Sequence, residues 1–267
     1  MPIVCNVNVQ RISREEFYEL DYTVMKLAFA VHKDMGRFWD ERIYQQELSD
    51  RCQDAGLGRV ATEVPIRVSH EGFTKLYTVD LLLNDSALYE LKTADALNGE
   101  HQKQTLNYIL LLGLQYGKLV NFRPRSVQYR FVTTRLTSDR RHHFTIDDRR
   151  WRNLEADSAG LRELIGDLLA DWGAFLDIDL FYEAIHHFRG GQDKVVKRIE
   201  VLSNSKTLGT QRAHLLNETT AFKLSAVVED PASYERHLHK FLCHTNLRAV
   251  QWVNFRRHEI AFATVTK

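Results

Sequence analysis

Two acidic residues and a lysine in the first half of the chain have the types and the spacing to bind a metal ion. The apolar runs 75–83 and 87–93 contain Asp80 in the first run and Glu90 and Lys92 in the second. Three polar residues separate the runs, which predicts a hairpin. Counting back from this turn along both strands places Asp80 opposite Glu90, with Lys92 two residues further along the same face.

Carboxylates at directly paired positions repel each other, because their Cβ atoms lie about 4.5 to 5.5 Å apart. A divalent cation relieves this repulsion. Magnesium takes a few carboxylate oxygens and keeps several waters, which leaves positions for the phosphate oxygens of a substrate. The ion lowers the pKa of a bound water, and a neighbouring ammonium orients that water or helps to deprotonate it. Asp80, Glu90 and Lys92 therefore suit a phosphodiesterase that depends on Mg²⁺ or Mn²⁺.

A simpler interpretation of the three residues is a surface ladder of ion pairs. Structural ion pairs are common, and an Asp…Glu-x-Lys pattern also arises by chance. The neighbouring residues of both runs are mostly apolar, and a charge in such a run is costly without a partner. The residue types alone leave both interpretations open.

The elements that must position these residues follow from hydrophobic periodicity. Helical spacing predicts two helices before the hairpin and one after it, and alternation predicts further strands. This mixture predicts an α/β fold. The predicted helices of the first half are 22–33, 40–52 and 100–114, and the predicted strands are 60–68, 75–83, 87–93, 118–122 and 127–134.

The hairpin residues Asp80 and Glu90-Leu91-Lys92 are followed on the next predicted helix by the segment 104–108, QTLNY. This pattern resembles the PD-(D/E)XK nuclease superfamily, and its QxxxY element resembles the lambda-exonuclease-like branch. Upstream, the segment 32–44, HKDMGRFWDERIY, resembles the signature of the bacterial GxxExxY proteins. The resemblance covers residues 22–134.

The resemblance implies a restriction-endonuclease-like core, in which a central mixed sheet is flanked by helices. It further implies that a glutamate on the early helix completes the acidic cluster. The implied roles are metal binding by Asp80, Glu90 and Glu41, assistance of the attacking water by Lys92, and flanking of the site by Gln104 and Tyr108.

A segment in the second half repeats one in the first half. Residues 83–122 and 216–255 align without a gap, and Asn121 falls on Asn254. The match predicts an internal duplication, and chance similarity between two amphipathic stretches is the alternative. The second copy is predicted to lack the metal site. The same offset places Ala213, Lys223, Ser225 and His237 at the positions of Asp80, Glu90, Lys92 and Gln104.

The length of 267 residues suits more than one compact unit. We expect a nuclease-like domain over residues 1–137, a basic linker and helix over 138–172, and the degenerate repeat over 173–267. The chain has 36 basic and 35 acidic residues, so its total charge gives no general attraction to nucleic acid. Contacts with nucleic acid must come from local patches. The arginine-rich stretch 140–152 is open to two interpretations, a phosphate contact and a solvated connection.

The three cysteines are far apart and form no CxxC pair, which suits reduced thiols and gives no zinc signal. The first residues lack a signal-peptide pattern, and the longest apolar stretch is too short to span a bilayer. We therefore expect a cytoplasmic protein. The predicted function is metal-dependent hydrolysis of phosphodiester bonds in nucleic acid, in DNA rather than RNA. The alternatives are an inactive nuclease-fold protein that binds nucleic acid or a protein partner, and a purely structural protein. A homo-oligomer remains open.

Overall fold

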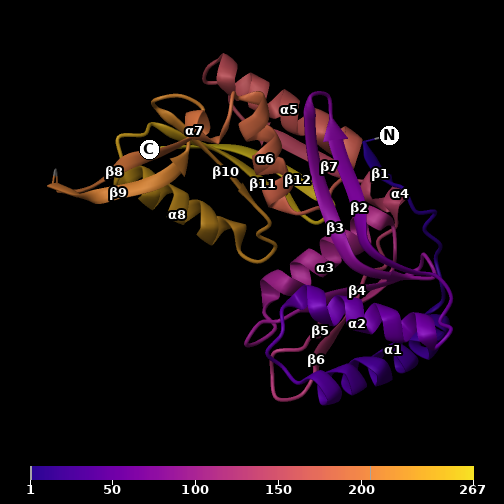
Figure 1. Cartoon of the computed structure of the whole chain (residues 1–267). Helices are drawn as coiled ribbons and strands as arrows, with labels where there is room; N and C mark the ends of the chain where they lie inside the picture. The colour runs from indigo at the N-terminus through magenta and orange to yellow at the C-terminus, as the bar shows by residue number, and fades with distance from the viewer. Residues whose placement is uncertain (1, 205) are drawn as a thin grey trace. The chain divides into compact units, whose positions relative to one another are not determined.

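The computed structural model describes residues 2–204 and 206–267. The chain forms two compact units, which comprise residues 1–138 and 139–267 (Figure 1). The first unit contains strand β1 (Ile3–Cys5), helices α1 (Arg14–Met35) and α2 (Glu41–Asp54), strands β2 (Val60–His70), β3 (Phe73–Leu83) and β4 (Ala87–Lys92), helix α3 (Gly99–Leu112), and strands β5 (Tyr116–Asn121) and β6 (Gln128–Thr133).

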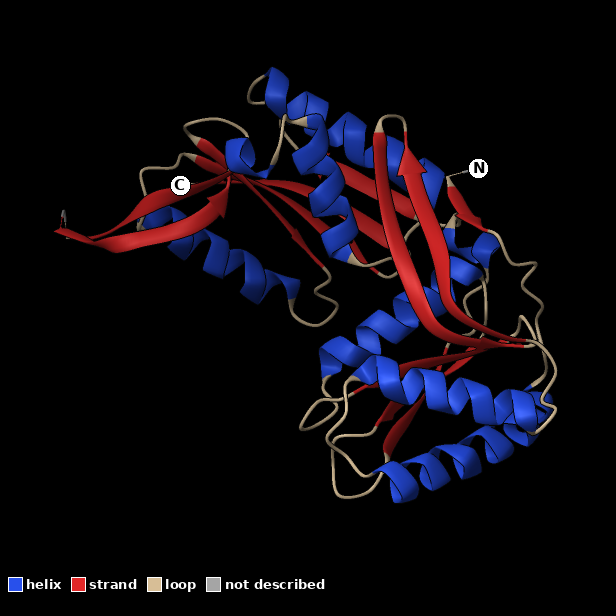
Figure 2. Ribbon diagram, in the orientation of Figure 1, coloured by secondary structure: helices blue, strands red, loops and turns tan. Residues whose placement is uncertain are grey.

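The first unit has one six-stranded sheet with the order β1-β2-β3-β4-β5-β6. All neighbouring strands are antiparallel except β4 and β5, which are parallel. Helix α3 supplies the crossover that a parallel pair requires. Helices flank the sheet (Figure 2), and a core of buried residues from α1, α2 and the central strands includes Phe17, Tyr44 and Leu81.

Helix α1 begins at Arg14, eight residues before the start predicted from apolar spacing. The reason is a capping box. Ser13 Oγ accepts from Glu16 N–H at 3.1 Å, and Glu16 Oε2 accepts from Ser13 N–H at 2.7 Å. These contacts satisfy backbone donors that the first turn leaves free, so the helix extends through a polar segment.

The second unit has a four-stranded sheet with the order β10-β11-β12-β7 and a separate hairpin of β8 and β9. In chain order its helices and strands are β7 (Thr145–Arg150), α5 (Ala156–Trp172), α6 (Ile178–Phe188), α7 (Gln192–Val195), β8 (Val196–Ser203), β9 (Lys206–His214), β10 (Thr220–Ser225), α8 (Pro231–Cys243), β11 (Ala249–Arg256) and β12 (Glu259–Thr266), and the short helix α4 (Ser138–Arg141) precedes them.

Residues 145–150 fall in the stretch expected to form a basic connection, but they form strand β7, which pairs parallel to β12. Their polarity hid the strand, because an edge strand with exposed side chains needs no apolar alternation. The predicted fold class is confirmed: the chain has a mixed α/β fold with a central mixed sheet flanked by helices, as a restriction-endonuclease-like core requires. Within the described residues, no helix combines the length and apolarity that a bilayer crossing needs.

Candidate metal and catalytic site

The hairpin of β3 and β4 has the predicted register. Leu83 faces Ala87, Leu82 faces Leu88 and Leu81 faces Tyr89, so the next positions on the two strands are Asp80 and Glu90. The turn takes Asn84 and Asp85 through positive φ angles of 52° and 54°, a conformation that Asn and Asp adopt more readily than most residues. The two carboxylates that the sequence placed together therefore lie on adjacent strands near the middle of the sheet.

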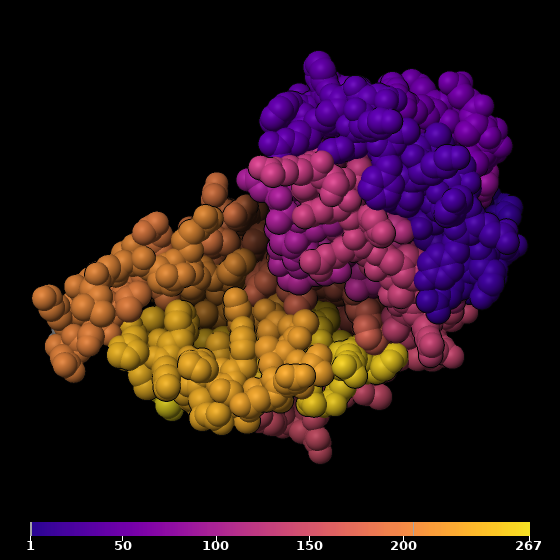
Figure 3. All heavy atoms as spheres, turned by 90° about the horizontal axis from the view of Figure 1, so that it is seen from below, coloured from indigo at the N-terminus to yellow at the C-terminus, as the bar shows by residue number. Residues whose placement is uncertain are grey.

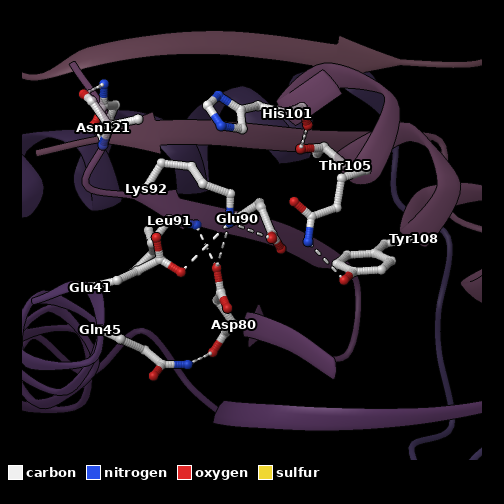
Figure 4. Close-up of polar contacts among 12 residues, drawn as sticks. Glu41, Gln45, Asp80, Glu90, Leu91, Lys92, His101, Thr105, Tyr108 and Asn121 are labelled. Carbon is white, nitrogen blue, oxygen red and sulfur yellow. Dashed lines mark hydrogen bonds and ion pairs between the residues drawn. The ribbon is translucent and has the colours of Figure 1, made fainter. Parts of the chain in front are cut away.

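The ammonium of Lys92 lies among three carboxylates (Figure 4). Lys92 Nζ donates to Glu90 Oε1 at 2.8 Å, and it lies 3.6 Å from Glu41 Oε1 and 4.0 Å from Asp80 Oδ2. Glu41 is the first residue of α2, whereas the other three come from the hairpin. The structure thus brings four of the six predicted site residues into one cluster.

The loop that enters α2 is fixed by polar contacts, and these contacts place Glu41. Tyr44 donates its hydroxyl proton to Gly36 O at 2.9 Å, and its hydroxyl oxygen accepts from Trp39 N–H at 3.3 Å. The guanidinium of Arg123 donates to the backbone carbonyls of Thr93 and Arg37. Arg123 thus links the end of the hairpin to this loop.

Asp80 is held by Gln45, which the sequence analysis did not single out, and by the backbone of Leu91. Gln45 Nε2 donates to the Asp80 backbone carbonyl at 2.6 Å and to Glu63 Oε1 at 2.7 Å. The carboxylate oxygen Oδ2 of Asp80 accepts from Leu91 N–H at 2.7 Å. Gln45 lies one helical turn after Glu41, so the shared helix face was the available signal.

Burial and mutual repulsion shift the titration of both hairpin acids. Glu90 is only 1% exposed, and burial together with the charge of Asp80 raises its pKa to about 8 despite the nearby Lys92. Burial likewise raises the pKa of Asp80 to about 6, against the opposing effects of the Leu91 N–H and Lys92. Burial lowers the pKa of Lys92, but Glu90 and the other carboxylates outweigh it, so the net shift is upward. One ammonium therefore does not compensate for two buried carboxylates, and at pH 7 the raised pKa keeps Glu90 largely protonated.

The predicted metal ligands fit a hard divalent cation in their chemistry. Glu90 Oε2 is buried and has no hydrogen-bond partner among the described residues, and Asp80 and Glu90 both offer carboxylate oxygens. The side chains nevertheless surround Lys92 rather than a common vacant point. Within the described part of the chain, no three His, Cys, Asp or Glu side chains already converge as a metal cluster.

Gln104 and Tyr108 lie on the same face of α3, beside Glu90 in Figure 4. Gln104 Nε2 donates to the Tyr108 hydroxyl oxygen at 2.9 Å. Burial raises the pKa of Tyr108, and the charges of Glu90 and Asp80 add to this effect. The two residues therefore lie beside the acidic cluster without joining its ion pairs.

Residues 18–132 match a family model described as the PD-(D/E)XK nuclease superfamily. This stretch contains all six predicted site residues. A solved structure titled "Crystal structure of SSO0001" is similar to the chain with 20% sequence identity and a TM-score of 0.29, and the match covers 47% of this chain and 61% of that chain. The chain therefore spans less than two thirds of that structure. No curated protein matches this chain.

The family match concerns the first unit, and it makes that unit similar to nucleases of this superfamily. The narrower resemblances, to the GxxExxY proteins and to the lambda-exonuclease-like branch, stay predictions.

Proposed function

We propose that the first unit is a metal-dependent nuclease that hydrolyses phosphodiester bonds, in DNA in preference to RNA. The observation that carries the proposal is the pair of buried carboxylates, Asp80 and Glu90, whose charge one lysine only partly compensates. Such a cluster has a strongly perturbed titration, which is typical of functional sites. The family match supports the same class of reaction.

In this proposal Asp80, Glu90 and Glu41 hold Mg²⁺ or Mn²⁺. When bound, the ion activates a water and stabilises charge on the phosphate. Leu91 N–H fixes one oxygen of Asp80, which leaves its other oxygen to act as a ligand. Lys92 orients the attacking water, because its ammonium lies 2.8 Å from Glu90 Oε1 and 4.0 Å from Asp80 Oδ2. Gln104 and Tyr108 offer side-chain donors at the edge of the site, where they would contact phosphate oxygens.

A specific observation favours a second candidate function. Lys92 already forms ion pairs with the three acids, and no preformed three-ligand group exists in the described residues. A protein with this arrangement could bind nucleic acid or a protein partner through the nuclease fold without cutting it. Metal binding and turnover must therefore be measured separately.

The test of turnover uses labelled single-stranded and double-stranded DNA and RNA with Mg²⁺ or Mn²⁺. We expect Glu90→Gln and Lys92→Ala to lower the cleavage rate by at least about 100-fold, since even outer-shell partners of a metal site contribute 10- to 100-fold. Glu47→Gln is the matched control, because Glu47 lies on α2 in an ion pair with Arg51. Equal rates in wild type and Lys92→Ala would refute the assignment.

Calorimetric titration with Mn²⁺ separates the two candidate functions. We expect heat of binding from wild type and Lys92→Ala, and none from Glu90→Gln, because Glu90 is a ligand and Lys92 is not. Binding by wild type without cleavage of any substrate would favour the inactive candidate. No heat from wild type would favour a purely structural cluster.

A further inference from the structure

The second unit contains a cavity of about 520 Å³, which lies within the usual size range of small-molecule sites. Its walls come from the hairpin β8–β9, strand β10, helix α8 and strand β11. Neither the predicted metal site nor the family match involves this region. The side chains that matter most are Arg212, His214, Lys223, Tyr234, His237 and Phe241.

The cavity occupies the place in the second unit that the acidic cluster occupies in the first. Strands β4 and β10 begin and end at positions that the sequence alignment pairs. The residues of the second unit that align with Asp80, Glu90, Gln104 and Tyr108 all line the cavity, and they are Ala213, Lys223, His237 and Phe241. Where the first unit has acids suited to a cation, the second has a lysine.

The cavity has a cationic rim. Lys223 and Arg212 line it and are exposed, whereas the lining contains no Asp or Glu. Within the described ranges neither cation forms an ion pair with a carboxylate. Burial lowers the pKa of His214 to about 4, with His186, Lys223 and Arg212 contributing, so His214 is neutral at pH 7. The uncompensated charge at this rim is therefore positive.

The walls also offer aromatic faces. Phe222 is buried, Phe241 is half-buried, and the ring of Tyr234 stacks on Trp252 with centroids 5.4 Å apart. Rings held in place by such packing present flat surfaces to a ligand at little entropic cost. A ligand that satisfies both features combines an aromatic ring with an anionic group, and a nucleotide has this combination.

The neighbouring hairpin extends the positive surface. Most of β9 is exposed, and the hairpin carries Lys197, Arg198, Lys206 and Arg212 against one acidic residue, Glu200. It projects from the second unit as a narrow arm, shown in orange in Figure 3. Basic residues on an exposed two-stranded ribbon can follow a phosphate backbone. This feature favours a nucleotide that belongs to a strand over a free one.

We infer that this cavity binds one nucleotide of a single-stranded nucleic acid, with the base against Tyr234 and Phe241 and the phosphate at Lys223 and Arg212. The inference does not depend on catalysis in the first unit. It gives the second unit a strand-binding role at the positions that align with the predicted metal site.

The test is fluorescence anisotropy of a labelled oligothymidylate with the full chain in EDTA, so that cleavage cannot contribute. We expect Lys223→Ala and Arg212→Ala each to weaken binding by roughly fivefold to tenfold, as loss of a charge-assisted contact does. Each should also lower the slope of log affinity against log salt concentration by about one. Arg248→Ala is the matched control, because Arg248 is an exposed cation of the same unit outside the cavity.

Competition with a free nucleotide distinguishes a site for a nucleotide within a strand from a site for a free nucleotide. Displacement of the oligonucleotide by thymidine 5′-monophosphate from wild type but not from Lys223→Ala would assign the cavity to a free nucleotide. This result would overturn the inference that the cavity binds a strand. No displacement, together with the expected losses, supports the strand. Equal affinity and salt slope in Lys223→Ala and Arg248→Ala, or no binding by wild type, would overturn the inference. If Lys223→Ala fails to fold, as judged by circular dichroism, Arg212→Ala decides alone. Because no metal is present, failure here leaves the proposed cleavage at Glu90 intact.

Discussion

The segment β4-α3-β5-β6 of the first unit and the segment β10-α8-β11-β12 of the second have the same strand pairing. Leu88 pairs with Gly117 and Tyr116 with Thr133. At the same offset as in the sequence alignment, Ala221 pairs with Val250 and Ala249 with Thr266. The chemistry of the two segments differs, because a fully buried Glu90 in one corresponds to an exposed Lys223 in the other.

A buried asparagine makes the same contacts in both units. Asn121 accepts from Ala94 N–H at 3.0 Å and donates to Ala94 O at 2.7 Å. Asn254 accepts from Val227 N–H at 2.8 Å and donates to Val227 O at 2.9 Å. This shared brace supports the proposed duplication. The second unit also has this backbone arrangement without an acidic cluster.

The largest expected effect concerns a buried position of β5 that differs between the units. Lys118 Nζ is 2.5 Å from Asp21 Oδ2, and both side chains are less than 10% exposed. The aligned residue, Gln251, instead donates to Arg152 O and Ser158 Oγ. We expect Lys118→Met to lower the free energy of unfolding by about 3 to 5 kcal/mol, because it leaves Asp21 as an unpaired buried charge. Gln251→Met should cost only about 1 to 3 kcal/mol.

Urea denaturation of the two variants measures this difference. The double variant Asp21→Leu with Lys118→Met is the control, because it removes both charges and should recover much of the lost stability. If Lys118→Met and Gln251→Met lower the free energy of unfolding equally, the predicted difference between the charged Lys118 contact and the neutral Gln251 contacts is wrong.

The next effect is a loss of stability with rising pH, which Glu90 of the first unit should cause. Burial raises the folded-state pKa of Glu90 from 4.5 to about 8, so the folded state binds this proton more tightly than the unfolded state. Stability from this group is therefore complete below about pH 4.5 and is lost as the pH rises toward 8. One pKa unit corresponds to about 1.4 kcal/mol, so the whole shift corresponds to roughly 5 kcal/mol, of which roughly 3 to 4 kcal/mol should be lost between pH 5 and pH 8.

Denaturation of wild type and Glu90→Gln in EDTA, at pH 5 and pH 8, isolates the contribution of Glu90. The variant should lose less stability over this interval. Addition of Mn²⁺ at pH 8 should stabilise wild type and leave the variant unchanged. An identical pH dependence in the two proteins would contradict the burial of an ionisable Glu90.

The smallest effect tests the shared brace. Asn121→Ala and Asn254→Ala should each lower the free energy of unfolding by about 1 to 3 kcal/mol, because each leaves one backbone N–H and one C=O without its partner. Thermal and urea unfolding measure the two variants side by side. Costs that differ by more than a factor of about two would argue that the asparagines do not play corresponding roles.

Much of the site could be predicted because it rests on local patterns. The apolar runs around the turn fixed the hairpin register, and this register placed Asp80 beside Glu90. Glu41 came from the resemblance alone, since no local pattern links residue 41 to a hairpin forty residues later. The contact of Gln45 with the Asp80 carbonyl depends on tertiary packing, so residue types do not reveal it.

The second unit was harder to predict from sequence. Strand β9 is largely exposed and has little apolar alternation, so hydrophobic periodicity does not predict it. Its cationic cavity also depends on residues from separate elements. The alignment placed Lys223 and His237 at the positions of site residues but could not indicate that a cavity replaces the cluster.

The polar strand β7 has a consequence for self-association. It pairs with β12 and so covers backbone groups that β12 would otherwise present to another chain. Its own charges are engaged: Arg149 pairs with Asp147, Arg150 with Glu235 and Asp148 with Arg162. A further strand adding to β7 would have to accommodate these charged side chains, which opposes edge-to-edge aggregation. The arginine-rich stretch 140–152, for which a solvated connection was one interpretation, thus supplies an edge strand that disfavours pairing with a further strand.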